Sequence, residues 1–490
     1  MAKSVSNRIK ANFLSRAIFS QKLNNPLGYL LLILAGALMA YVTTVYGVKF
    51  GLIILAALMV IPMLVGIVGD FKFGITVIIV IGFFTDEITK FISAPVGILN
   101  DGILLLLGIS LMLRLIKERN FKPFHHPITV FITVWMLYNI FAVLNPVAAT
   151  RIGWLYAVRP MAGITFIYFV MAYAVKNFDD AKYYVKVILG LTVLSGLYGL
   201  KQEWIGFSSA EMAWLHSDPL RFMLIYQWGR LRVFSVFSDP TTMGIIFVYI
   251  TFFIVALMTG PFSKRKKILG GVAIAVMMLA NAYGGSRTPV ALIPIGAIYY
   301  LILRVNKKTL IGVLGFFMLG TVFMLKSTGS GVIYRMQSSF STNDASVQIR
   351  LEHQEFVQPF LRENPFGWGL ASIGEWGKRF NSDSWMADFA HDSGFIRIAA
   401  ELGYVGLFIY MLFLAVSMYY MLKYYFLVKD PKIKSFYLGI NLVFFILIIS
   451  NFPQESIVIL PTSLFFNILL AIGVRLKDFD EYYVKYHKNR

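Results

Sequence analysis

The chain has 490 residues, of which 58% are hydrophobic and only 14% are charged. Soluble domains carry about a quarter charged residues, so this composition excludes an ordinary soluble globule and indicates an integral membrane protein. The sequence has no cysteine, which excludes disulfides and thiolate metal sites. The net charge of +20 is compatible with nucleic-acid binding, but the basic residues gather between apolar runs, which favours a membrane-topology signal.

Apolar runs long enough to cross a bilayer recur along the whole sequence and predict about fourteen membrane-spanning helices. The expected spans are 28–46, 51–69, 73–89, 101–116, 128–144, 161–175, 184–201, 242–259, 268–283, 289–303, 309–326, 393–422, 435–450 and 460–474. No small-residue cleavage site follows the basic N-terminal segment, which favours a cytoplasmic tail over a removable signal peptide.

Two hydrophilic segments interrupt these spans. The predicted parts of the chain are a basic tail (1–27), N-terminal transmembrane helices (28–201), a first outer loop (202–241), central transmembrane helices (242–326), a large second outer loop (327–392), C-terminal transmembrane helices (393–474) and a second tail (475–490). The expected fold is an all-α polytopic integral membrane protein with about 12–14 transmembrane helices.

The positions of lysine and arginine predict the orientation of the chain, because cytoplasmic loops carry an excess of both residues. Basic residues concentrate at 3–22, 114–122, 263–267, 304–308, 423–434 and 475–490. The short loops on the other side carry far fewer. Both termini are therefore predicted to be cytoplasmic and both long loops to face the outside, and nucleic acid is not an expected partner.

The first outer loop ends in "GRLRVFSVFSDPTTMG" (229–244), which carries Arg230 and Arg232 beside aromatic residues. The "SDP" sequence predicts a helix start, with Asp239 as the cap and Pro240 at the first helical position.

A tight outer turn, "NAYGGSRTPVALIP" (281–294), carries Arg287. Gly284 and Gly285 permit a positive φ or a close backbone approach there. Arginine near the hydrocarbon is costly, and on the outer face it opposes the usual charge bias. Two such sites, each next to a helix end, favour an anion pocket, because the planar guanidinium makes bidentate bonds to phosphate. Snorkelling or structural pairing is the alternative.

The second outer loop contains a predicted amphipathic helix within "DASVQIRLEHQEFVQPFLRENPFGWGLASIG" (344–374). Ile349, Phe356 and Phe360 belong to its apolar stripe, while Arg350 lies on or beside the polar side. We expect this helix to lie on the membrane surface and to end at "NPFGWG". A plain solvated face is the alternative.

The stretch "HDSGFIRIAAELGYVGLF" (391–408) places His391 and Asp392 where the second loop re-enters the membrane. A histidine there is a candidate general base, although a structural role as a cap or donor is the alternative. Asp392 and Ser393 are also candidate helix caps.

Further along the same stretch, Arg397 and Glu401 are spaced i, i+4, which predicts an ion pair inside the membrane. We interpret the pair as scaffold. Gly403 and Gly406 would let a neighbouring helix approach closely.

These segments together resemble the O-antigen ligase and polymerase superfamily of bacterial membrane glycosyltransferases. The resemblance rests on "RLRVFSVFSDPTTMG", "GGSRTPVALIP", "IRLEHQEFVQPFLRENPFGWGL" and "HDSGFIRIAAELGYVGLF", and on their order and shared sidedness. It covers residues 225–410 well and the N-terminal spans only through hydropathy.

The resemblance implies a GT-C-like fold in the bacterial inner membrane, with the active site facing the periplasm. It also implies metal-independent, inverting transfer of a glycan from undecaprenyl diphosphate to an acceptor hydroxyl such as a lipid A core sugar, with no cofactor. In that reaction Arg232 and Arg287 are the first candidates for binding the diphosphate, and Arg230 and Arg350 the second. His391 would be the base or would orient the acceptor, with Asp392, Arg397 and Glu401 in support.

Three alternatives stay open. Within the superfamily they are an O-antigen or exopolysaccharide polymerase and a protein O-oligosaccharyltransferase, which would use the same donor. In another class, a polysaccharide transporter or flippase is favoured by the number of spans and by "TDEITKF" (85–91), where Asp86, Glu87 and Lys90 sit at a span end.

Overall fold

A computed structural model describes residues 26–47, 63–91, 96–148, 150–227, 229–325, 345–389 and 393–487. The chain divides into two units, Met1–Gly69 and Asp70–Arg490. In the first unit, α2 (Pro26–Tyr46) is an apolar helix that matches the first predicted span. Most of the second predicted span, 51–69, lies outside the described residues.

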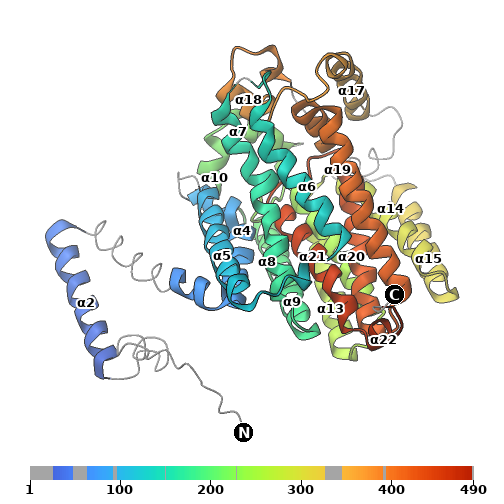
Figure 1. Cartoon of the computed structure of the whole chain (residues 1–490). Coiled ribbons are helices and arrows are strands. Elements are labelled where there is room, and N and C mark those ends of the chain that lie inside the picture. The colour runs from blue at the N-terminus through green and yellow to red at the C-terminus, as the bar shows by residue number, and fades with distance from the viewer. Residues whose placement is uncertain are drawn as a thin grey trace, which may run out of the picture. The chain divides into compact units, whose positions relative to one another are not determined.

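The second unit is a bundle of helices (Figure 1). Its helices are α4 (Phe71–Phe91), α5 (Gly97–Glu118), α6 (Pro127–Phe141), α7 (Arg151–Val158), α8 (Ile167–Ala174), α9 (Phe178–Trp204), α10 (Ser209–His216), α11 (Pro219–Ile225), α12 (Pro240–Met258), α13 (Lys264–Gly284), α14 (Arg287–Leu303), α15 (Lys307–Leu325), α17 (Ala345–Glu363), α18 (Gly374–Phe380), α19 (Gly394–Leu427), α20 (Pro431–Ser450), α21 (Thr462–Leu476) and α22 (Glu481–His487). The first outer loop therefore contains two short helices, α10 and α11, that the sequence did not predict.

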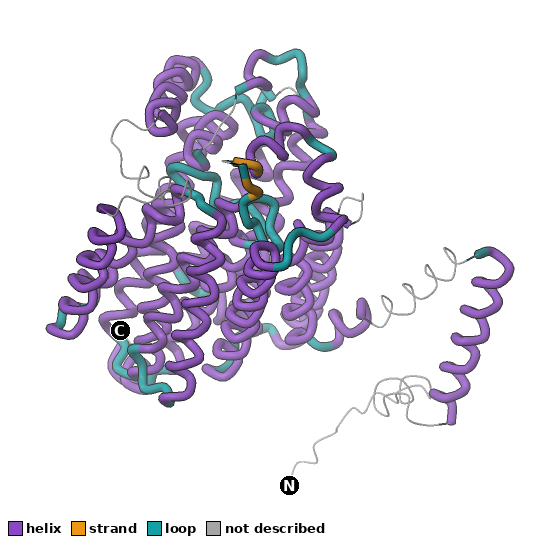
Figure 2. The backbone as a smooth tube through the Cα atoms, turned by 180° about the vertical axis from the view of Figure 1, so that it is seen from behind, coloured by secondary structure: helices purple, strands orange, loops and turns teal. Residues whose placement is uncertain are grey.

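Two short strands, β1 (Tyr226–Gln227) and β2 (Arg230–Leu231), pair antiparallel, with Tyr226 opposite Leu231. Figure 2 shows this hairpin among the loops above the long helices. It is a small local exception to the predicted all-α architecture.

Nine helical segments in the described part of the chain are long and apolar enough to cross a membrane. They are Gly28–Val45, Gly97–Glu118, Pro127–Leu144, Arg151–Ala174, Phe178–Trp204, Pro240–Met258, Lys264–Gly284, Gly394–Leu427 and Pro431–Ser450. Arg287–Leu303 is a shorter apolar helix. The protein is thus an all-α polytopic membrane protein, while the predicted total of about fourteen spans and the GT-C likeness stay predictions.

The centre of the bundle is built from α12, α20 and α21, whose side chains are buried almost all round. Helices packed in a membrane gain from close van der Waals contact, which small residues allow. Gly439 of α20 is one such position, because a β-carbon there would come within 2.8 Å of the Phe253 ring of α12. The contacts of α12 extend to α13 and α14, and those of α20 extend to α14 and α19.

The long helix α19 is broken at Gly403, which has φ 71° and ψ −174°. Two carbonyls of the preceding turn accept from the second outer loop instead of from their own helix. The Trp368 N–H donates to the Ala400 oxygen at 2.9 Å, and the Gly369 N–H donates to the Glu401 oxygen at 2.8 Å. The "NPFGWG" segment (364–369) therefore docks, backbone to backbone, on the break.

Other contacts complete this junction. The Val405 N–H donates to the Pro365 oxygen at 3.4 Å, and the Tyr138 hydroxyl of α6 donates to the Leu402 oxygen at 2.8 Å. The group that approaches Gly403 is thus loop backbone rather than the neighbouring helix that we expected. Gly406 does face a helix, since a β-carbon there would lie 2.8 Å from the Tyr138 ring.

Replacing Gly403 by alanine tests this junction. A β-carbon would overlap the Pro365 oxygen, and the backbone has a positive φ that L-residues rarely adopt. We expect Gly403→Ala to lower the free energy of unfolding by more than about 2 kcal/mol, measured as a drop in melting temperature in detergent micelles. Gly271→Ala is the matched control, because its helical site in α13 has open space around it. Equal melting temperatures for the two variants would contradict the assignment of the break.

Candidate functional site

Two of the segments singled out in the sequence meet at the turn between α13 and α14. Gly285 ends α13 in the left-handed conformation, with φ 57°. At Gly284 a β-carbon would lie 2.7 Å from the Met243 side chain, so both predicted roles of this glycine pair are confirmed. The buried Ser286 precedes α14, and the half-buried Arg287 is its first residue.

Arg232 reaches this turn from the segment after β2. Its side chain is buried and donates from Nε to the Gly284 carbonyl at 2.8 Å and from Nη2 to the Ser286 hydroxyl. Its Nη1 donates to the Leu224 carbonyl at 3.3 Å. Because the guanidinium bonds three groups of the protein, Arg232 holds the end of the first outer loop against the residue next to Arg287.

Arg230 lies on the same turn but has an acidic partner. Its Nη2 is 2.9 Å from Glu203 Oε2 at the end of α9, and the same nitrogen donates to the Tyr283 carbonyl at 3.4 Å. The side chain is about one-third exposed (33%). The sequence did not single out Glu203, since nothing local links it to a position far along the chain.

Helix α9 forms hydrogen bonds with the end of the first outer loop. The Gln202 amide accepts from the Ser235 N–H at 2.7 Å and donates to Glu211 at 2.5 Å. Burial alone raises the pKa of Glu211, but the hydrogen bonds from the Ser208 backbone and from Gln202 outweigh burial, and the pKa lies below its ordinary value. Glu211 therefore stays ionised near neutral pH as a structural acceptor.

The charges of "TDEITKF" support this same loop. Lys90 Nζ lies 2.8 Å from Glu87 Oε2 and donates to the Ser235 carbonyl at 3.2 Å. Asp86 accepts from the Ser238 N–H at 3.1 Å. These contacts give the three charges a structural role at the outer loop.

The start of α12 is as the sequence predicts. Asp239 caps the helix by accepting from the N–H groups of Thr241 at 2.8 Å and Thr242 at 2.9 Å, and Pro240 is the first helical residue. The Thr241 hydroxyl lies 3.2 Å from that of Ser286. The α12 start is therefore part of the same cluster as the α13–α14 turn.

A second charged cluster lies in α19. Arg397 Nε is 3.2 Å from Glu401 Oε2, which confirms the predicted ion pair. Arg397 also pairs through Nη1 with Glu455, in the turn between α20 and α21. Glu401 in turn accepts from the Ala371 N–H at 3.0 Å. All three charged side chains are buried or nearly so, so the cluster ties α19 to two loops.

Glu455 was not predicted as a partner of Arg397, although its position in the sequence indicates that it needs one. It is an acidic residue in a turn between two apolar helices, "NFPQESIVILP" (451–461), which the topology predicts to be outer, and it has no basic neighbour in the sequence. A carboxylate there needs a partner from elsewhere on the same side of the membrane.

The predicted helix of the second outer loop is present as α17. Its Val357 and Leu361 are buried in a cluster with Ile373 and Ile396. Val357 and Leu361 of its apolar side thus pack against the protein, whereas Phe356 is 46% exposed, and the expected place of the helix on the membrane surface stays a prediction. His353 lies beside the Phe389 ring, with centroids 5.1 Å apart.

The remaining candidates are only partly described. Arg350 lies in α17, but its side chain is outside the described part, and so are His391 and Asp392. Ser393 follows, and its side chain does not cap α19. Instead the Gly394 N–H donates to the Asn451 carbonyl at 3.0 Å, which anchors the helix start to the α20–α21 turn.

Among the residues that the structure describes, no group of three histidine or acidic side chains is arranged to hold a metal ion. Metal-independent transfer stays a prediction, because it rests on the resemblance. The diphosphate-binding roles of the arginines are predictions of the same kind.

Residues 272–411 match the model of a protein family described as "O-Antigen ligase". The matched segment runs from within α13 to within α19 and includes Arg287, Arg350, His391, Arg397 and Glu401. No curated protein matches the chain. The resemblance stated from the sequence is therefore confirmed for its central part, while Arg230 and Arg232 lie before the matched segment.

Removal of one carboxylate tests the cluster in α19. Glu455→Gln leaves Arg397 with one of its two buried partners, and breaking a buried pair costs about 3–5 kcal/mol. We expect a corresponding loss of unfolding free energy, measured by thermal melting in micelles. Glu375→Gln, at an exposed position of α18, removes the same charge as a control and should change stability by less than about 0.5 kcal/mol. A melting temperature unchanged by Glu455→Gln would contradict the pairing.

Proposed function

We propose that this chain, a member of the O-antigen ligase superfamily through residues 272–411, is a membrane glycosyltransferase. It transfers a glycan from undecaprenyl diphosphate to a hydroxyl of a lipid A core sugar. The reaction takes place on the periplasmic face of the bacterial inner membrane. The transfer is metal-independent and inverts the anomeric carbon. The family match and the meeting of Arg230, Arg232 and Arg287 at one turn support this proposal.

The meeting of the arginines carries the proposal. In the reaction the acceptor oxygen bonds to the anomeric carbon while the bond from that carbon to the diphosphate oxygen breaks. The diphosphate leaves with growing negative charge, which fixed cations stabilise strongly in a site of low dielectric. Arg287 opens α14, where the helix dipole adds to its positive charge.

The contacts of the arginines suggest a different role for each of them. Arg287 is the group we assign to the leaving diphosphate. Arg232 acts mainly through its bonds to Gly284 and Ser286, which set the position of Arg287 while adding positive charge nearby. Arg230 and Arg350 are second choices for direct contact, and Glu203 already neutralises part of the charge of Arg230.

The acceptor hydroxyl must lose a proton during attack. His391 is our candidate for general base or for orienting the acceptor, because imidazole titrates near neutral pH. Asp392 would orient the ring. The Gly394 N–H is bonded to the Asn451 carbonyl, which fixes the start of the helix that follows His391 in the sequence.

The alternatives differ in their acceptors or in their class. A polymerase would add the glycan to a second lipid-linked chain, and a protein O-oligosaccharyltransferase would add it to a serine or threonine. Offering all three acceptors with a labelled donor distinguishes them. One of the two observations that favoured a transporter, the charges of residues 85–91, is weakened, because Asp86, Glu87 and Lys90 have structural partners.

Substitution of the two candidate groups tests the proposal. With purified protein in lipid nanodiscs, labelled undecaprenyl-diphosphate glycan and lipid A core acceptor, we expect Arg287→Ala and His391→Ala each to slow transfer by about 100-fold or more. Both proteins should insert and melt normally. Arg362→Ala, at an exposed arginine of α17, is the matched control and should stay active. Full activity in either candidate variant would contradict the site.

Arg232→Lys tests positioning by Arg232. Lysine keeps the charge but lacks the planar fork that reaches both Gly284 and Ser286. We expect slower transfer, by about tenfold or more, because Arg287 would be misplaced. Wild-type turnover in this variant would show that a point charge suffices.

A further inference from the structure

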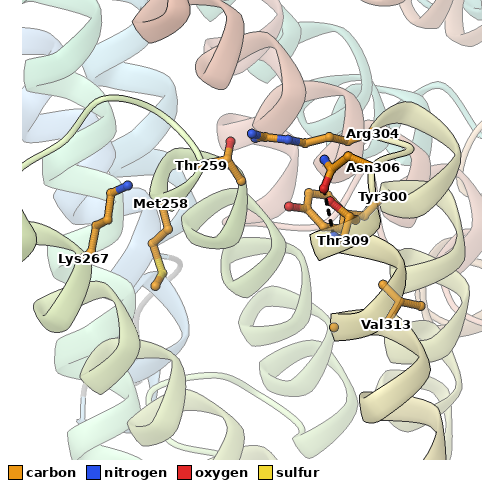
Figure 3. Close-up of a pocket in the computed structure, with 9 residues that line it drawn as sticks. Met258, Thr259, Lys267, Tyr300, Arg304, Asn306, Thr309 and Val313 are labelled. Carbon is orange, nitrogen blue, oxygen red and sulfur yellow. Dashed lines mark hydrogen bonds between the residues drawn. The ribbon is translucent and has the colours of Figure 1, made fainter.

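A hollow of about 380 Å³ lies at the other end of α13 and α14. Its lining includes Thr259, Lys267, Tyr300, Arg304 and Val313. In Figure 3 the Arg304 guanidinium and the Lys267 ammonium point toward the same gap from opposite sides. The dashed bond there joins the Thr309 N–H to Asn306, which accepts it at 2.9 Å and caps the start of α15.

A second hollow of about 230 Å³ adjoins the first, because Thr259 and Arg304 line both. It adds Tyr425 at the end of α19 and Lys434 near the start of α20. We call the two hollows together the basic groove. Arg304 lies between its two halves, with Lys267 on one side and Lys434 on the other.

The residues that line the basic groove, all within the described part of the chain, bring positive charge and no carboxylate. No Asp or Glu lines either hollow. Among the ion pairs of the described residues, none involves Lys267, Arg304 or Lys434. Lys434 does lie 5.3 Å from the Tyr425 ring centroid. Three half-buried cations gathered in this way repel one another unless an anion joins them.

The place of the groove in the bundle separates it from the site of the proposed reaction. Helix α14 runs from Arg287 at the candidate site to Leu303, next to Arg304. Helix α19 likewise begins at the second outer loop and ends near Tyr425. The groove thus lies at the opposite end of these helices, on the face that the lysine and arginine distribution predicts to be cytoplasmic.

The side chains that line the basic groove favour an amphiphilic ligand over a soluble anion. Met258 and Val313 line one hollow and Leu438 the other, beside the cations. Basic pockets between transmembrane helices on the cytoplasmic side are suited to lipid headgroups with phosphate. A phosphate on Arg304 would place the acyl chains along the apolar side chains, within the bilayer.

We propose that the basic groove binds the phosphate headgroup of an anionic glycerophospholipid of the cytoplasmic leaflet. Arg304 makes the central contact, and Lys267 and Lys434 neutralise the remaining charge. The bound lipid joins the α12–α13 and α14–α15 turns to the start of α20, at the end of the bundle remote from the proposed chemistry.

Lipid retention by the full-length protein tests the proposal. The protein, purified in a non-ionic detergent, is given phosphatidylglycerol or zwitterionic phosphatidylcholine, and bound lipid is counted by native mass spectrometry. We expect selective retention of phosphatidylglycerol, weakened about tenfold or more in the double variant Lys267→Gln, Arg304→Gln. The double variant Lys264→Gln, Arg265→Gln removes equal charge from exposed positions outside the groove and should retain the lipid.

Three results would overturn the proposal. They are equal retention of both lipids, equal retention by the two double variants, and displacement of phosphatidylglycerol by millimolar inorganic diphosphate, which would indicate a site for soluble anions. The melting temperature of each variant in phosphatidylcholine checks that it is folded. If the groove variant does not fold, 1 M salt with the wild-type protein replaces it, because screening should release a lipid held by charge.

Discussion

A helix inside a membrane must satisfy every backbone hydrogen-bonding group within the protein, and α19 breaks this pattern at Gly403. The structure depends on hydrogen bonds from other parts of the chain to the backbone groups at that break. The segment Pro365–Gly369 of the second outer loop supplies the missing partners, and its glycines have the positive φ values that this approach requires. Just before the break, Glu401 pairs with Arg397 and accepts from the Ala371 N–H. The segment Pro365–Ala371 is thereby fixed on α19, the helix at whose start we place the acceptor chemistry.

The arginines illustrate how one charge serves both structure and chemistry. Arg232 bonds the backbone carbonyls of Gly284 and Leu224 and the hydroxyl of Ser286, and these bonds fix its guanidinium at the α13–α14 turn. Arg230 differs because Glu203 offsets its charge. The fold thus holds a guanidinium in place at the α13–α14 turn, and catalysis by prearranged electrostatics requires charges fixed in this way. At the opposite end of α13 and α14, the cations of the basic groove line a hollow next to apolar side chains.

Features set by neighbouring residues were predictable from the sequence, and features set by distant ones were not. Asp239 and Pro240 start α12 as expected, and Arg397 pairs with Glu401 one helical turn away. Local spacing alone determines such contacts. Glu455 and Glu203 were missed because their partners are far away in the chain. The stripe of α17 was correctly seen as apolar, but amphipathicity does not say whether the apolar face meets lipid or protein.

We propose that the α13–α14 turn binds the leaving diphosphate and that the acceptor is activated from the start of α19. A structure of the protein with a non-hydrolysable undecaprenyl-diphosphate glycan tests it most directly. We expect a phosphate oxygen within hydrogen-bond distance of the Arg287 guanidinium, about 3 Å, and the His391 imidazole on the side of the first sugar. Diphosphate bound elsewhere, for example between helices at the membrane midplane as in a transporter, would contradict this assignment of the site.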